Sequence, residues 1–84
     1  MKSGWCDIMC STKIKHDVLT MIRNAKGIEH ISQVDALDIG YKRVKGTVAF
    51  ELYFDTFAHA RELAKLVHGK YTGTGNLAPM QRVY

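Results

Sequence analysis

The ten residues KGTVAFELYF, at positions 45–54, give the clearest strand pattern in the chain. Every second side chain is apolar: Val48, Phe50, Leu52 and Phe54. The side chains between them are Thr47, Ala49, Glu51 and Tyr53. Because successive side chains of a strand point to opposite faces of a sheet, the uniformly apolar set is predicted to face the core. This strand needs partners, which the neighbouring segments supply.

The segment DTFAHARELAKLVHG, residues 55–69, is predicted to be a helix. Asp55 or Thr56 is placed to cap its start, and Gly69 to end it. Its apolar residues fall at helical spacing and form one stripe, made of Phe57, Ala60, Leu63, Ala64 and Val67. After a glycine-containing loop, residues 80–84 are predicted to form a short last strand.

The N-terminal part shows a similar strand and helix. In residues 5–11, one face of a strand is indicated by Cys6, Ile8 and Cys10, and the other by Trp5, Asp7 and Met9. Residues 11–27 then carry apolar side chains at helical spacing: Ile14, Val18, Ile22 and Ala25. Ser11 or Thr12 is expected to cap this helix, and Gly27 to stop it.

Between these two parts lies a segment with an ambiguous pattern. We expect a strand at about residues 32–41, because β-branched and polar residues are interleaved there. Val34 and Ala36 alternate with Asp35, whereas two further apolar residues, Leu37 and Ile39, fall in the register of Asp35. A β-bulge would reconcile the two registers. The residues that follow, GYKRVKG at 40–46, are predicted to form a hairpin turn.

The predicted order is strand, helix, strand, strand, helix, strand. This order is typical of a ferredoxin-like α+β sandwich, in which two helices cover one face of a four-stranded antiparallel sheet and the other face is open. With 84 residues, the chain is expected to form this single domain over residues 1–84.

Composition favours an ordinary globular protein, with 46% hydrophobic and 24% charged residues. We find neither a signal-peptide core nor a run of about 20 apolar residues, so a soluble, cytoplasmic protein without a membrane partner is expected. The net charge of +4 is compatible with binding to phosphates or to an acidic protein surface.

Candidate sites for metal or catalysis receive little support. Cys6 and Cys10 would lie roughly 13 Å apart on a strand, too far to form a disulfide or to share a metal ion. His59 and His68 are nine residues apart and face different directions on a helix. No Ser or Cys stands near a His in a recognisable nucleophile motif. We therefore predict no cofactor, no metal, no catalytic residues and no enzymatic activity.

Two carboxylates are predicted to be neighbours on the open face. Asp7 and Glu51 would lie side by side if the first and third strands pair, as this fold requires. Such a pair could act as an acid–base dyad, but pairing of the two acids with Arg82 on the adjacent last strand is the favoured interpretation.

Residues 45–70 resemble the second half of an RNA recognition motif. The shared features are Lys-Gly before the strand, alternating apolar residues, an acidic residue entering an Ala-rich helix, and a Gly near the helix end. RNA recognition motifs stack bases on aromatic side chains of the open sheet face. The matching positions are Thr47 and Ala49, neither of which can stack a base. The residues left for RNA or DNA binding are on the basic hairpin: Tyr41, Lys42, Arg43 and Lys45.

The basic hairpin also has a simpler explanation, since exposed turns are often rich in Lys and Gly for solubility. The open face offers another candidate surface, made of Trp5, Met9, Glu51 and Tyr53. Exposed aromatic and Met side chains are enriched in protein interfaces, and a strand edge can pair with a second copy to form a homodimer.

We therefore expect a small non-catalytic protein-binding domain, an adaptor or inhibitor that acts through its open sheet face. It would be similar to the compact inhibitors of viruses and mobile elements, including anti-CRISPR-like proteins, several of which have this fold. A protein partner is favoured over nucleic acid because the stacking residues are missing and acids lie on the open face. An RNA-recognition-motif-like module that binds RNA or DNA through the basic hairpin is the alternative.

Overall fold

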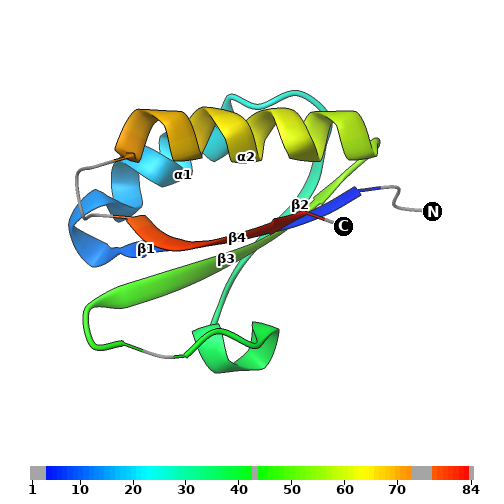
Figure 1. Ribbon diagram of the computed structural model, residues 1–84. Coiled ribbons are helices and arrows are strands. Elements are labelled where there is room, and N and C mark those ends of the chain that lie inside the picture. Colours follow the sequence, from blue (N-terminus) through cyan, green and yellow to red (C-terminus); the bar gives the residue numbers. More distant parts are fainter. Residues whose placement is uncertain (1–3, 43, 73–76, 84) are drawn as a thin grey trace.

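The computed structural model describes residues 4–42, 44–72 and 77–83, the last segment as backbone alone. Within this part of the chain, two α-helices lie on one face of a four-stranded antiparallel sheet of order β2-β3-β1-β4 (Figure 1). The α+β class is thus confirmed. The strands are β1 (Gly4–Ser11), β2 (Ile28–Val34), β3 (Thr47–Phe54) and β4 (Leu77–Val83), and the helices are α1 (Lys15–Arg23) and α2 (Phe57–Tyr71).

The two central strands pair as their alternating patterns require. β1 and β3 are antiparallel from Gly4 opposite Phe54 to Ser11 opposite Thr47. Their predicted core faces are confirmed, because all seven apolar side chains are buried in one cluster beneath the helices: Cys6, Ile8, Cys10, Val48, Phe50, Leu52 and Phe54. Each strand contributes one continuous apolar face, and this fixes the register, since a slip of one residue would turn that face to the opposite side.

Both helices cover this core. A short 3-10 helix, η1 (Thr12–Ile14), precedes α1, and the Ser11 hydroxyl caps it by accepting from the Lys13 N–H. Thr56 caps α2 and accepts from the His59 N–H. The helix runs past Gly69, which was expected to end it, and Tyr71 joins the buried stripe. Phe57 was expected in that stripe but is 38% exposed and lies against the Arg61 guanidinium, 4.8 Å from the ring centre.

The predicted second strand was placed too late. β2 ends at Val34, and a 3-10 helix, η2 (Ala36–Ile39), replaces its expected second half. The Asp35 carboxylate caps this turn by accepting from the Leu37 N–H, and Gly40 ends it in the left-handed conformation at φ 88°. The two conflicting registers therefore reflect a change from strand to helix, and the irregular pairing of β2 lies between Ile28 and His30.

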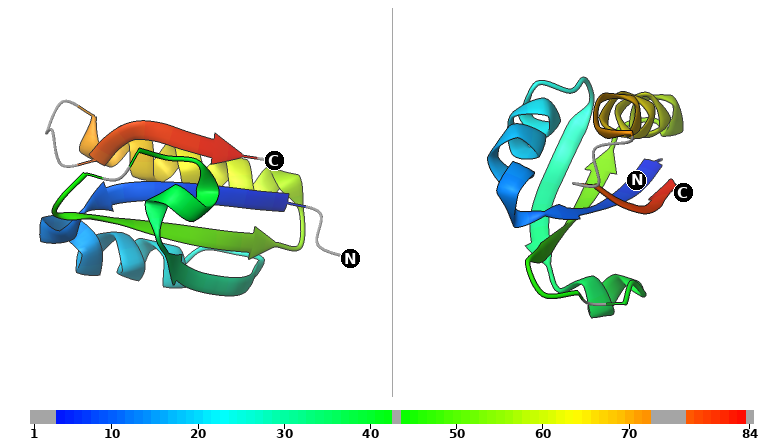
Figure 2. Two further views of the ribbon diagram at one scale, coloured as in Figure 1. Left: turned by 90° about the horizontal axis from the view of Figure 1, so that it is seen from below. Right: turned by 60° about the vertical axis from the view of Figure 1, so that its left-hand side comes forward.

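The connection between β2 and β3 is no simple hairpin. We call its described part, residues 35–42 and 44–46, the strap. Seen from below the sheet, the strap lies across the face opposite the helices (Figure 2). A second buried cluster forms there, made of Met9, Ala36, Ile39, Tyr41 and Ala49, with Val34 at its edge. The expectation of an open sheet face is therefore wrong for this part of the sheet.

The last strand begins earlier than predicted, at Leu77 instead of residue 80, and it pairs with β1 at the sheet edge. Tyr84 lies outside the described residues. In the described part of the chain, no helix is long and apolar enough to span a membrane.

Candidate functional site

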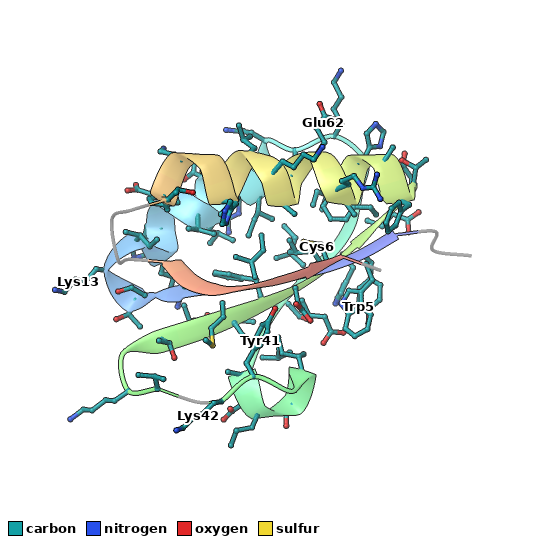
Figure 3. The ribbon with its side chains drawn as sticks, in the orientation of Figure 1. Trp5, Cys6, Lys13, Tyr41, Lys42 and Glu62 are labelled. Carbon is teal, nitrogen blue, oxygen red and sulfur yellow. The ribbon has the colours of Figure 1, made fainter. Side chains whose placement is uncertain are left out.

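The strap is fastened to the sheet by a buried polar contact. The Tyr41 hydroxyl donates a hydrogen bond to Oδ1 of Asp7, over 2.5 Å. Tyr41 is 1% exposed and Asp7 is fully buried. In Figure 3, Tyr41 extends from the strap toward the sheet. Tyr41 therefore cannot serve as a nucleic-acid contact, and Met9, also buried in this cluster, cannot serve as a partner contact. Both site predictions are wrong, because the strap covers Met9 and holds the Tyr41 ring against the sheet.

The predicted carboxylate neighbours do face one another in the sheet. Asp7 pairs with Glu51 on β3 and with Arg82 on β4 in the backbone register. Each acid has a phenol partner: Tyr41 for Asp7, and Tyr53, whose hydroxyl donates to Oε1 of Glu51. This hydrogen bond to the Glu51 carboxylate raises the pKa of Tyr53. The side chain of Arg82 lies outside the described residues.

Three aromatic side chains form a row across β1, β3 and β2. Trp5 is the cross-strand partner of Tyr53, which in turn pairs with His30. The Trp5 and Tyr53 rings are nearly parallel, at 8°, with centroids 6.0 Å apart, and His30 is tilted 46° to Tyr53 at 6.0 Å. We call these three residues the aromatic row. Trp5 and Tyr53 are half-buried and His30 is exposed.

The aromatic row lies on the end of the sheet face that the strap leaves uncovered. In Figure 3, Trp5 is on the strap's side of the sheet, toward the beginning of β1. The predicted partner surface thus retains Trp5, Glu51 and Tyr53, and it gains His30. Sequence reasoning missed His30 because the second strand was placed after it; a strand that begins at Ile28 would have put His30 beside Tyr53.

Two of the predicted basic contacts are exposed on the strap. Lys42 and Lys45 both face solvent, and the Lys42 side chain extends from the strap in Figure 3. Arg43 lies outside the described residues. Two apolar side chains accompany these cations, Leu37 at 61% and Val44 at 53% exposed. The strap therefore presents Lys42 and Lys45 to solvent, whereas Tyr41 points inward.

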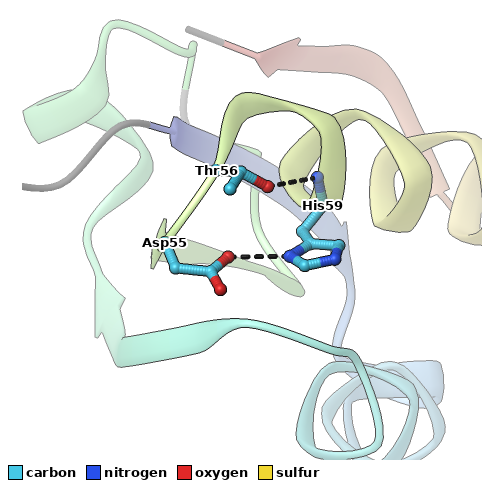
Figure 4. Close-up of polar contacts among 3 residues, drawn as sticks. All are labelled: Asp55, Thr56 and His59. Atoms are coloured by element: carbon cyan, nitrogen blue, oxygen red, sulfur yellow. Dashed lines mark hydrogen bonds and ion pairs between the residues drawn. The ribbon is translucent and has the colours of Figure 1, made fainter.

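A second candidate site lies on the helix side of the sheet. Nδ1 of His59 lies 2.7 Å from Oδ1 of Asp55, and the His59 N–H donates to the Thr56 hydroxyl (Figure 4). The hydrogen bond with His59 lowers the pKa of the Asp55 carboxyl. These contacts fix His59 in the first turn of α2, with its imidazole against the preceding loop.

His59 borders a pocket between the end of α1 and the outer part of α2. The pocket has a volume of about 210 Å³ and is lined by Asn24, Ala25, Lys26, His59, Glu62, Leu63 and Leu66. We call it the helix-side pocket. Its residues come from two segments more than 30 positions apart, so no local sequence motif predicts the pocket. The sequence prediction of a helix with His59 on it gave no reason to place Lys26 nearby.

The two cysteines are buried in the helix-side core and form no disulfide. Burial raises the pKa of the Cys6 thiol to about 12 and that of Cys10 to about 11. A thiol with such a pKa is almost fully protonated at neutral pH and is a poor nucleophile and metal ligand. Both residues therefore act as small apolar side chains of the core.

The comparisons with known proteins establish the fold alone. No family model and no curated protein matches the chain. Among solved structures, a PII-like signalling protein of Thermus thermophilus is similar, with a TM-score of 0.63 and 13% identity over 96% of this chain and 82% of that one. SnoaB, a cofactor-independent oxygenase from Streptomyces nogalater, has a TM-score of 0.61 and 6% identity over 100% of this chain and 92% of its own. One neighbour is a signalling protein and the other an enzyme, so the fold does not decide between these classes.

Proposed function

We propose that the protein is a small, non-catalytic protein-binding domain that uses the uncovered end of its sheet. The observation that carries this proposal is the aromatic row, in which Trp5 and Tyr53 stack on the two paired central strands and remain partly exposed. Aromatic side chains held on strands lose little conformational entropy on binding, and Trp and Tyr are the most frequent anchors of protein interfaces.

The neighbouring charge supports an inference about the partner's chemistry. Glu51 lies directly beside the row and is hydrogen bonded to the Tyr53 hydroxyl. A guanidinium or ammonium group stacks favourably on aromatic faces and pairs with a carboxylate. We therefore infer a partner that presents an apolar segment with an Arg or Lys beside it. This partner would be the target on which the protein acts as an adaptor or inhibitor.

We also infer that the fold is ferredoxin-like. The element order, the sheet order β2-β3-β1-β4 and the antiparallel pairing support this assignment. The long strap across the second face is an addition to the plain arrangement. It divides that face into a covered part and the end that we assign to the partner.

The test begins with a peptide display library selected on the immobilised protein, followed by titration of the enriched peptides. We expect enriched peptides to contain an apolar residue near Arg or Lys, and Trp5→Ala to weaken their binding at least tenfold. Leu37→Ala is the matched control, because Leu37 is an exposed apolar residue on the strap, and it is expected to leave binding unchanged.

Two outcomes would redirect this proposal. Peptides that bind Trp5→Ala and Tyr53→Ala as tightly as the native protein would place the interface elsewhere. A dimer in sedimentation equilibrium that dissociates on Trp5→Ala would make the partner a second copy of the chain. Thermal unfolding of each variant separates these results from loss of the fold.

The alternative is a nucleic-acid-binding module, as the RNA-recognition-motif resemblance implies. It is favoured by the exposure of Lys42 and Lys45 and by the net charge of +4, although Tyr41 is buried and adds no stacking surface. Phosphate contacts would give salt-dependent binding with little sequence preference.

Titration of labelled single-stranded RNA and DNA at low and moderate salt tests this alternative. If the strap binds phosphates, changing Lys42, Arg43 and Lys45 together to Ala should weaken binding and flatten its salt dependence. Changing Arg23, Lys65 and Lys70 together to Ala is the control, because these three exposed cations carry the same charge and lie on the helices, away from the strap. Equal losses in both triple variants would indicate nonspecific attraction, and no binding at low salt would remove nucleic acid from consideration.

A further inference from the structure

We propose that the helix-side pocket binds a small organic monocarboxylate with an apolar chain, a function separate from that of the aromatic row. The pocket combines an apolar wall with hydrogen-bond donors of positive character, and the residues that supply them are held by contacts that have no part in the protein-binding surface. The argument rests on the pocket's lining, on the orientation of His59 and on the turn at Gly27.

The orientation of His59 leaves one ring nitrogen for a ligand. Nδ1 is engaged by the Asp55 carboxylate at 2.7 Å. The Asp55 carboxylate holds a proton on Nδ1, so Nε2 is the ring nitrogen directed to other contacts; it accepts a hydrogen bond in the neutral imidazole and donates one in the imidazolium. His59 lines the pocket and its side chain is 31% exposed, which makes it accessible to a small solute from solvent.

The turn at Gly27 brings the two segments of the pocket together. Its backbone carbonyl accepts a hydrogen bond from the Asp55 N–H over 2.9 Å. A Cβ at this position would lie 2.1 Å from Oδ1 of Asp55 and 2.5 Å from Nδ1 of His59, and φ is +72°. A larger residue here would be strained and would displace the Asp55 and His59 side chains, whereas glycine lets the chain entering β2 pack directly on that pair. This close approach places the neighbouring Lys26 and Asn24 in the same pocket as His59.

The lining indicates the chemistry of the ligand. Lys26 offers a cation and Asn24 a hydrogen-bond donor, which suit a carboxylate, and His59 adds a second donor in its imidazolium form. Leu63, Leu66 and Ala25 offer an apolar wall for a short chain. Glu62 is also in the lining and projects from the outer side of α2 in Figure 3. Its carboxylate disfavours a second negative charge on the ligand, so a monoanion fits better than a dianion.

The pocket's volume limits the ligand's size. About 210 Å³ corresponds to roughly seven water molecules at about 30 Å³ each. A carboxylate with a chain of four to six carbons is of this order. A ligand of so few atoms in a half-open pocket should bind with a dissociation constant in the millimolar range.

The experiment is a titration of ¹⁵N-labelled protein followed by amide chemical shifts. Sodium hexanoate is the first probe and 1-hexanol is the neutral control. Leucine tests whether an added ammonium group strengthens binding by pairing with the Glu62 carboxylate. We expect hexanoate to shift the amides of residues 24–27 and 59–66 saturably, and 1-hexanol to bind those sites at least fivefold more weakly.

Two variants assign the anion contact. Lys26→Gln and His59→Gln are each expected to weaken hexanoate binding about threefold or more, whereas Lys45→Gln, which removes the same charge on the other side of the sheet, should not. Lys26 is exposed, so its substitution leaves the packing intact even if His59→Gln disturbs the turn.

Leucine distinguishes the two sources of this ligand chemistry. Tighter binding of leucine than of hexanoate, lost in Glu62→Gln, would assign the pocket to amino acids, and the reverse order to simple fatty acids. Equal binding of hexanoate and 1-hexanol, or no saturable shift at these residues, would overturn the proposal. None of these outcomes bears on peptide binding at Trp5, so the two proposals succeed or fail separately.

Discussion

At the scale of single residues, Tyr41 decides how the second face of the sheet is used. A tyrosine between glycines and cations suggests a solvent-exposed turn, yet this side chain is 1% exposed and bonded to a buried carboxylate. A buried carboxylate requires polar partners, because desolvation of an ion is costly without them. The Tyr41 hydroxyl supplies one such contact and at the same time fixes the position of the strap.

Tyr41→Phe tests this contact. Removing the hydroxyl deletes a hydrogen bond to a buried acid while it keeps the ring, so we expect a loss of about 1–3 kcal/mol in the free energy of unfolding. For a domain of this size, each kcal/mol lowers Tm by about 4–8 °C. Thermal unfolding measured by circular dichroism gives the value. Tyr53→Phe, which removes a half-exposed hydroxyl from Glu51, is the control, with an expected loss below about 1 kcal/mol. Equal effects of the two changes would contradict the special role of Tyr41.

At the scale of elements, the sequence predicted those strands and helices in which apolar residues repeat at one regular spacing from end to end. The alternation in Cys6, Ile8 and Cys10, and in the strand from Val48 to Phe54, directly reflects burial under the helices, so both strands and both of their core faces are confirmed. α2 was predicted nearly to its ends for the same reason. These elements are determined by local pattern because one face of each is buried along its whole length.

The strap was not predicted because its signals are short and have two meanings. Asp35 as a cap and Gly40 as a left-handed end are the residues that a 3-10 turn needs, but they also suit the end of a strand and a hairpin. The side on which Ala36, Ile39 and Tyr41 are buried depends on contacts with Met9 and Ala49, which are distant in sequence. The helix-side pocket was missed for the same reason, since Lys26 and His59 meet only in the folded chain.

Gly27, in the turn between α1 and β2, is compared with two other glycines. The comparison separates the cost of a left-handed backbone from the cost of contact with Asp55 and His59. Gly27→Ala forces a side chain into a left-handed conformation and against Asp55 and His59, whereas Gly46→Ala, at φ +83°, meets nothing within 4 Å. We expect Gly46→Ala to cost about 1–2 kcal/mol and Gly27→Ala clearly more. Gly69→Ala lies within α2 with open space around it and should instead stabilise by about 0.5–1 kcal/mol. Urea unfolding of the three variants gives the comparison; similar losses for Gly27→Ala and Gly46→Ala would mean that Asp55 and His59 move aside freely.

At the scale of the whole molecule, the chain covers both faces of its sheet with unequal layers. The helices bury the larger cluster, and the strap buries a smaller one around Tyr41. A domain of 84 residues has little stability to spare, so a second cluster under a connecting segment is a considerable addition. The second cluster also covers Met9 and Ala49 on that face, whereas Trp5, Glu51 and Tyr53 stay partly exposed.

The two buried cysteines allow the opening of the core to be measured by thiol labelling. Both thiols are inaccessible in the native state and almost fully protonated at neutral pH. An alkylating reagent can therefore modify them only when the helices separate from the sheet, and the rate of labelling becomes a measure of how often the core opens. Because no other cysteines occur in the sequence, the labelling rate reports on the core alone and needs no engineered probe. It can be run on every variant discussed above, with or without a bound peptide or carboxylate.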